Sequence, residues 1–132
     1  RPYEDFLNSD FIPFKAGIEA GAESILISHN IVESIDAEHP ASLSKKVIDI
    51  LRNDMDFTGI IMTDDLSMSA VSETDSPVVT AVLAGNDMLI VSDLETSYNT
   101  LLSAVSNGDI PEDRINESVL RIIKWKYYLG LL

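Results

Sequence analysis

Three short apolar runs punctuate the chain, and each ends in polar residues. They lie at residues 24–28, 60–62 and 88–92. A short apolar run bounded by turn residues is typical of a buried strand, although a buried helical segment gives a similar pattern. The β-branched pair Ile60 and Ile61, which follows Gly59, favours a strand for the central run. The pattern therefore predicts three buried strands, of which the middle one leads directly into Asp64 and Asp65.

Segments with helical spacing of their apolar residues separate and follow these runs. Helices are expected over residues 11–20, from Ser42 or Ser44 to about residue 53, and over 78–83, 95–105 and 111–128. Residues 1–8 form either a short helix or an irregular lead-in. Regular alternation of helix and strand favours βαβ units and a parallel sheet. Three strands cannot close a barrel, which normally has about eight.

Polar residues at the carboxyl ends of the strands mark a candidate site. They are His29 after the first strand, Asp64 with Asp65 after the second, and Asp93 after the third. Parallel strands bring these ends to one face, where ligands bind in α/β folds. An Asp after a strand is also a common N-cap of the next helix. The pattern alone leaves both interpretations of the Asp pair open.

Composition and charge narrow the function classes. The 132 residues allow one domain, and an apolar fraction of 45% is enough for a core. Nine basic against 22 acidic residues give a net charge of −13, which argues against a nucleic-acid partner. No apolar run approaches about 18 residues, so no membrane span is expected. Without cysteine there is neither a disulfide nor a thiolate metal site. The N-terminus is no signal peptide. Because the chain opens at Arg1 with neither an initiator Met nor an obvious domain start, we expect it to be a piece of something longer.

Five motifs occur along the chain in a fixed order. They are Phe11-Ile12-Pro13-Phe14, Ser28-His29, Pro40-Ala41-Ser42-Leu43-Ser44, Thr63-Asp64-Asp65-Leu66-Ser67-Met68 and Ala84-Gly85-Asn86-Asp87-Met88. In this order they resemble family 3 glycoside hydrolases, in particular the bacterial β-N-acetylglucosaminidase branch, and the resemblance extends over nearly the whole chain. The tail around Arg114-Ile115-Asn116-Glu117-Ser118-Val119 is similar to the closing helices of that family's catalytic domain.

The resemblance implies an α/β fold in which this chain is the C-terminal part of a (β/α)8 barrel of the TIM type. Residues 1–132 would then be a single partial domain with parallel strands six, seven and eight. The family's nucleophile carries over to Asp64, the first residue of the Asp pair. Asp65 matches a variable position, so it is interpreted as a helix cap or an orienting group. The implied reaction is retaining hydrolysis of a β-linked N-acetylglucosamine from a carbohydrate substrate, with no cofactor and no metal.

The second catalytic group lies outside this chain by the same resemblance. In this branch the acid/base is a His on a loop after strand five, upstream of Arg1, so the isolated chain is expected to be inactive. His29 is placed beside the sugar, where it contacts the substrate or supports the nucleophile. The alternatives for His29 are a hydrogen-bonded structural histidine and, less favoured, the acid/base itself. Family members are lipid-anchored outside the cell or cytoplasmic, so the compartment stays open.

Two other function classes stay open at this point. A receiver-like phosphoacceptor domain also has an apolar strand that ends in Asp, which suits Mg²⁺ and phosphoryl chemistry. Such domains usually carry an acidic pair after the first strand, whereas here that strand ends in Ser28-His29. The other class is a non-catalytic α/β fragment. As a piece of a barrel, the chain would have unpaired edges on its outer strands and bare apolar faces, so we expect the isolated chain to self-associate. The alternative is a monomer in which residues 1–20 fold over one edge.

Overall fold

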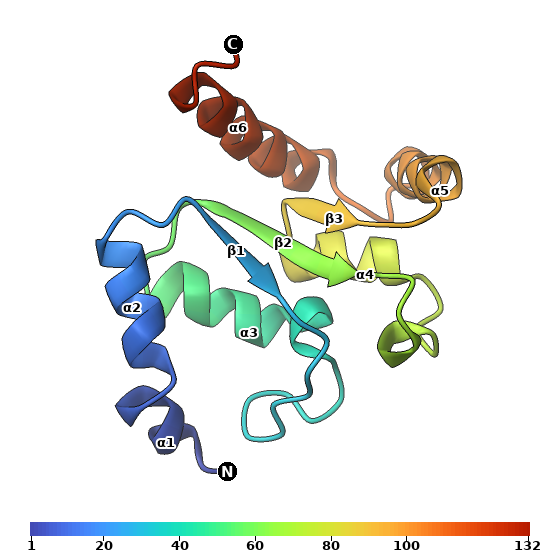
Figure 1. Cartoon of the computed structure of the whole chain (residues 1–132). Helices are drawn as coiled ribbons and strands as arrows, with labels where there is room; N and C mark the ends of the chain where they lie inside the picture. Colours follow the sequence, from blue (N-terminus) through green and yellow to red (C-terminus); the bar gives the residue numbers. More distant parts are fainter.

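The chain forms a three-stranded parallel sheet in the computed structural model, which describes all 132 residues. Strands β1 (Ser24–Ile27), β2 (Ile60–Asp65) and β3 (Met88–Ile90) lie side by side in that order (Figure 1). The prediction of an α/β fold with parallel strands is therefore confirmed. The central strand β2 is longer than the sequence predicts, because it pairs with both neighbours and takes in the Asp pair.

Helices connect and cover the strands much as the periodicity predicts. They are α1 (Tyr3–Asn8), α2 (Phe11–Glu19), α3 (Lys45–Asp49), α4 (Pro77–Ala84), α5 (Leu94–Asn107) and α6 (Glu112–Tyr128). Helix α3 continues as the π-helical turn η2 (Ile50–Asp54), and two 3-10 turns occur at η1 (Ala41–Leu43) and η3 (Ser69–Val71). None of the helices combines the length and the apolar character that crossing a bilayer requires.

Side-chain caps and left-handed residues set the ends of several helices. The Ser44 hydroxyl accepts the N–H of Val47 and caps α3, so of the two candidate serines it is Ser44 that caps this helix. Helices α4 and α5 end at Gly85 and Gly108, both with positive φ, a conformation that glycine adopts without steric cost.

The main core fills the space between one face of the sheet and α3. Its buried side chains include Ile27, Ile48, Leu51, Phe57 and Ile61. Two smaller clusters extend it under α4 and α5, one around Leu43, Leu66 and Val71 and one around Val82, Ala104 and Ile110. Leu102 on α5 does not join these clusters, since 52% of this residue is exposed.

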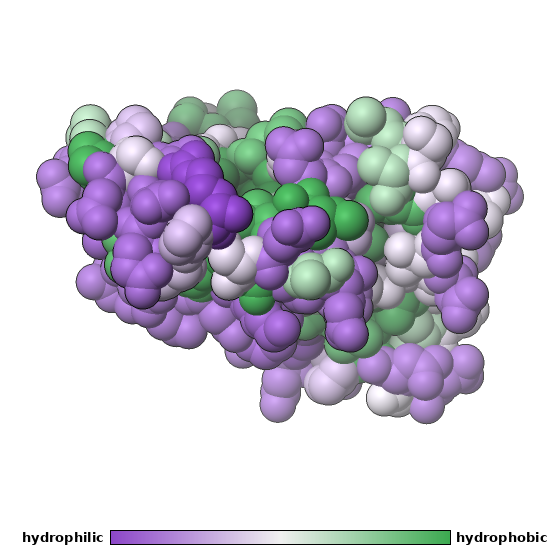
Figure 2. Space-filling model, turned by 90° about the horizontal axis from the view of Figure 1, so that it is seen from below, coloured by the Kyte–Doolittle hydropathy of each residue, from purple (hydrophilic) through white to green (hydrophobic).

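The opposite face of the sheet is largely open. Leu26, Met62 and Met88 occupy one row across the three strands, and Leu26 is 50% exposed. Parallel sheets are normally covered on both faces, so this exposure is unusual for an α/β domain. A hollow of about 280 Å³, lined mostly by apolar side chains, also lies between α1, α2, β1 and α3. Seen from below, apolar patches lie near the middle of the molecule among polar side chains (Figure 2).

Candidate active site at the carboxyl edge of the sheet

Asp64 and Asp65 are the last two residues of β2, and a buried residue lies on either side of the pair. Thr63 is fully buried and Leu66 is nearly so, whereas the two carboxylates between them are partly exposed. The Asp64 Oδ1 atom accepts the N–H of Asp65 at 2.8 Å. No other group of the chain donates to this carboxylate, so its Oδ2 atom has no hydrogen-bond partner within the chain.

The pairing of β2 with β3 is irregular at this point. Met62 pairs with Met88 and Asp65 pairs with Ile90. Between these two pairs β2 has one more residue than β3. The Thr63 hydroxyl oxygen accepts the N–H of Ile90 at 3.2 Å, in place of a backbone carbonyl. Such bulges re-aim side chains and are frequent beside active sites. The bulge therefore sets the direction in which the Asp pair leaves the sheet.

Asp65 is held in a turn, unlike its neighbour. Its Oδ1 atom accepts the N–H of Ser67 at 2.9 Å. This backbone hydrogen bond and a further one from the Ser67 side chain lower the pKa of Asp65 below its usual range, against a smaller opposing effect of desolvation. The carboxylate of Asp65 thus closes the turn after β2, whereas that of Asp64 does not.

His29 connects the end of β1 to the end of β2. Its Nδ1 atom lies 2.6 Å from the Ser42 hydroxyl, and its Nε2 atom lies 2.9 Å from the carbonyl oxygen of Asp65. The residue is 9% exposed. Both ring nitrogens therefore have partners inside the chain. A direct contact between His29 and a sugar stays a prediction.

Asp36 fastens the loop between β1 and α3, a role that sequence reasoning missed. Its carboxylate accepts the Ser44 hydroxyl at 2.8 Å, the Glu38 N–H at 3.2 Å and the His39 ring at 3.1 Å. Burial by itself raises the pKa of Asp36, but these donors and the charge of Lys46 together lower it below the usual value. In the sequence Asp36 is one of many loop acids, and nothing in its local pattern reveals its burial.

Asn86 ties the loop to the start of β3. Its side-chain Nδ2 atom donates to the carbonyl of Ser42 at 2.7 Å and to that of Ala81 at 2.9 Å. A continuous series of hydrogen bonds therefore runs from Asn86 through Ser42 and His29 to Asp65. This series of hydrogen bonds joins four of the five motifs on which the family resemblance rests.

The third strand end belongs to a helix cap. The Asp93 carboxylate accepts the N–H of Thr96 at 3.0 Å and so caps α5. No group of three or more His, Cys, Asp and Glu side chains is arranged to hold a metal ion. Of the polar strand ends that the sequence singles out, the structure joins His29 to the Asp pair and assigns Asp93 to capping.

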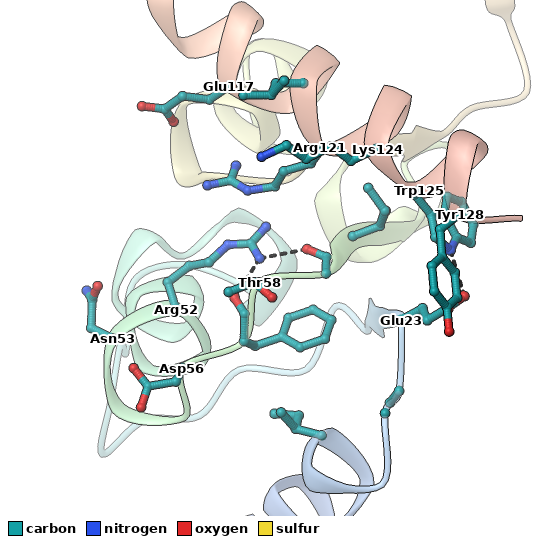
Figure 3. A pocket seen from close by; sticks show the side chains of 17 residues that line it. Glu23, Arg52, Asn53, Asp56, Thr58, Glu117, Arg121, Lys124, Trp125 and Tyr128 are labelled. Carbon is teal, nitrogen blue, oxygen red and sulfur yellow. Dashed lines mark hydrogen bonds between the residues drawn. The ribbon is translucent and has the colours of Figure 1, made fainter. Parts of the chain in front are cut away.

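A cleft lies at the other end of the strands. It measures about 920 Å³ and lies between α6 and residues 52–60. Arg52, Arg121 and Lys124 line it, together with Trp125, whose Nε1 atom donates to Glu23 (Figure 3). The Arg52 guanidinium is already used by the carbonyls of Phe57 and Gly59 and by Asp87. This cleft is thus lined by structural cations and is separate from Asp64.

Comparisons with known proteins agree with this arrangement. The family model described as the glycosyl hydrolase family 3 N terminal domain matches residues 1–125. A β-hexosaminidase of Xylella fastidiosa is 39% identical over 110 residues, which are 80% of this chain and 32% of that protein. A β-hexosaminidase of Methylococcus capsulatus is 34% identical over 110 residues, which are 81% of this chain and 33% of that protein.

Solved structures give the same picture. The β-N-acetylglucosaminidase from Thermotoga maritima superimposes with a TM-score of 0.87 at 30% identity, over 95% of this chain and 30% of that one. A family 3 β-N-acetylglucosaminidase from a Paenibacillus species gives a TM-score of 0.91 at 29% identity, over 99% of this chain and 27% of that one. The alignments with the curated relatives span between 21% and 33% of those proteins' length.

Proposed function

The chain belongs to glycoside hydrolase family 3, and on this basis we propose that the whole protein is a retaining exo-β-N-acetylglucosaminidase with Asp64 as its nucleophile. Relatives named β-hexosaminidase and β-N-acetylglucosaminidase support the reaction and the substrate class, a carbohydrate with a β-linked N-acetylglucosamine. One observation carries the assignment of the nucleophile. Of the two carboxylates that end β2, Asp65 is tied into a turn by the backbone and the side chain of Ser67, whereas Asp64 accepts only the N–H of its neighbour Asp65.

The chemistry of a retaining glycosidase fits this difference. One carboxylate attacks the anomeric carbon and forms a glycosyl-enzyme, and a second group protonates the leaving oxygen and then activates water. In Asp64 the hydrogen bond from the Asp65 N–H fixes Oδ1 and with it the plane of the carboxylate. Oδ2 then forms the bond to the sugar. We assign no cofactor to this reaction.

We further propose that residues 1–132 are the C-terminal part of a (β/α)8 barrel, with β1, β2 and β3 as strands six, seven and eight. The open face of the sheet supports this, because Leu26, Met88 and Ile90 would face the barrel interior. The outer strands β1 and β3 each have only one neighbour. The acid/base would come from the rest of the barrel, as would most sugar-binding groups. The family assignment removes the receiver-like alternative.

The nucleophile is tested in the whole protein with two matched variants. Asp64→Asn should lower hydrolysis by several orders of magnitude, because removing a group that acts covalently abolishes the step. Asp65→Asn should cost far less, since an amide oxygen still accepts the Ser67 N–H. An activated 2-fluoro-glycoside should leave a mass adduct on Asp64. A larger loss in Asp65→Asn, or an adduct on another residue, would contradict the assignment.

The isolated chain should be inactive and should self-associate. Its sheet has apolar residues on an open face and free edges on β1 and β3, and such surfaces recruit further strands. The net charge of −13 opposes large aggregates and favours a small closed oligomer. Light scattering measures the mass of the species in solution and therefore the extent of self-association. A monodisperse species of 14.5 kDa across a wide concentration range would contradict the proposed association.

A further inference from the structure

We propose that His29 is a positioning residue for the nucleophile. As a neutral ring with its hydrogen on Nε2, it clamps the backbone of Asp65, and through that backbone it sets the orientation of the Asp64 carboxylate. The inference rests on the proposed role of Asp64. It gives His29 neither proton transfer nor sugar binding.

The partners of the ring determine where its hydrogen lies. Nε2 is 2.9 Å from the carbonyl oxygen of Asp65, and a carbonyl only accepts, so Nε2 carries the hydrogen and donates it. In a neutral ring Nδ1 then has a lone pair, and the Ser42 hydroxyl, 2.6 Å away, donates to it. The two hydrogen bonds together select one tautomer and one ring orientation.

The far end of the clamp is itself fixed. Ser42 is fully buried, so its hydroxyl has no access to water as an alternative partner. The Ser42 N–H donates to the Ser28 carbonyl at 3.2 Å, and its own carbonyl accepts the Asn86 amide at 2.7 Å. The ring of His29 is therefore held against a rigid support rather than against a mobile loop.

The hydrogen bond from His29 is one of three that hold Asp65 in place. The carbonyl of Asp65 accepts from His29, its carboxylate accepts from the Ser67 N–H, and its own N–H donates to Asp64 Oδ1. Rotation of the Asp65 backbone would move that N–H and with it the oxygen that it holds. His29 thus acts on the nucleophile through one residue, without touching it.

The irregular pairing of β2 and β3 explains why a side-chain clamp is needed here. A regular ladder would fix each peptide of β2, but the bulge between Met62 and Asp65 interrupts it beside Asp64. A misplacement of about 1 Å costs an enzyme on the order of 10²-fold in rate. The hydrogen bond from His29 supplies, on the β1 side, the constraint that the interrupted ladder lacks.

Nitrogen NMR of the ¹⁵N-histidine-labelled chain tests the clamp without any activity. The chain has two histidines, so His39→Gln identifies the signals of His29. We expect a directly observed, slowly exchanging hydrogen on Nε2 and an unprotonated Nδ1, and Ser42→Ala should shift the Nδ1 signal. A ring protonated on Nδ1, or one that averages both tautomers, would overturn the clamp.

Kinetics of the whole protein test the positioning role. His29→Phe keeps a ring but lacks both hydrogen bonds, and we expect kcat per active site to fall about 10- to 100-fold with KM nearly unchanged. His29→Gln offers a donor and an acceptor and should recover most of that loss. Active sites are counted by labelling with the 2-fluoro-glycoside, which separates slower turnover from a smaller folded fraction.

The two failures are distinguishable. An unchanged kcat per labelled site in both variants would overturn the positioning role, as would a Gln variant no better than the Phe variant. A wild-type protein without glycosidase activity would overturn the proposed function. The NMR measurement would still test the hydrogen bonds of His29 in that case.

Discussion

The carboxylates at the two ends of the strands differ in burial and in their partners. At the amino edge, where β3 begins, the Asp87 side chain is completely buried and surrounded by cations. At the carboxyl edge, where β2 ends, Asp64 is partly exposed and accepts a single backbone N–H. Barrel enzymes carry their chemistry at the carboxyl ends of the strands and their stability at the amino ends. The contrast in these contacts is the one that the proposed barrel and the proposed role of Asp64 predict.

The amino edge is a joint between four elements. Asp87 Oδ1 accepts the Ser118 hydroxyl at 2.7 Å and Arg121 at 3.0 Å, both from α6. Its Oδ2 accepts Arg52 from η2 at 2.5 Å and the N–H of Ile61 from β2 at 3.1 Å. Burial lowers the pKa of Arg52 from its usual value, and Asp87 opposes that shift. The guanidinium is thus desolvated and depends on the carboxylate for its partner.

The largest expected effect breaks this joint. Asp87→Asn removes the only carboxylate beside Arg52, and loss of one member of a buried ion pair costs about 3–5 kcal/mol in the free energy of unfolding. Urea unfolding of the isolated chain, followed by circular dichroism at low concentration, measures it. The matched control is Asp64→Asn at the other edge, which should change the stability by less than about 0.5 kcal/mol. Equal losses at the two edges would remove the distinction between them.

Sequence reasoning reached the layout of the fold because local patterns specify it. The apolar runs and the helical periodicities placed the three strands and helices α2 to α6 near their observed positions, whereas they left residues 1–8, which contain α1, open. Parallel pairing followed from the alternation of elements. It also brought His29 and the Asp pair to one edge, as observed.

The finer features of the site depend on contacts between distant residues. The bulge beside Asp64 arises from the pairing of β2 with β3, and the Asp36 and Asp87 carboxylates are buried by partners from other elements. Ser118 and Asp87 are 31 residues apart, so no local periodicity connects them. The sequence placed two acids after β2, but only their hydrogen bonds distinguish Asp64 from Asp65.

Asp36 sharpens the comparison, because it is a buried carboxylate at the carboxyl edge that is structural. Asp36→Asn should lower the free energy of unfolding by about 1.5–3 kcal/mol at neutral pH, the usual contribution of hydrogen bonds to a charged group. The lowered pKa of Asp36 adds stability above the unfolded value near about pH 4, and that stability is lost as the pH falls through the folded pKa. The difference between wild type and variant should therefore shrink on acidification. Urea titrations at several pH values check it, and a difference independent of pH would contradict the ionised state.

The smallest effect is expected from an exposed charge at the amino edge, which can be compared with the buried charge of Asp87. Arg114 lies 3.9 Å from Asp87 and 3.5 Å from Glu117, whose side chain is 60% exposed. Arg114 also donates to the carbonyls of Val82 and Asn86 at 3.0 and 2.8 Å, so it keeps partners when Glu117 is neutralised. Exposed ion pairs contribute about 0–1 kcal/mol and are screened by salt.

Glu117→Gln should therefore lower the free energy of unfolding by less than about 0.5 kcal/mol, and even this difference should vanish at about 1 M salt. Urea unfolding at low and high salt measures both values. A loss comparable to that of Asp87→Asn would mean that net charge, rather than the buried contacts of Asp87, stabilises this edge.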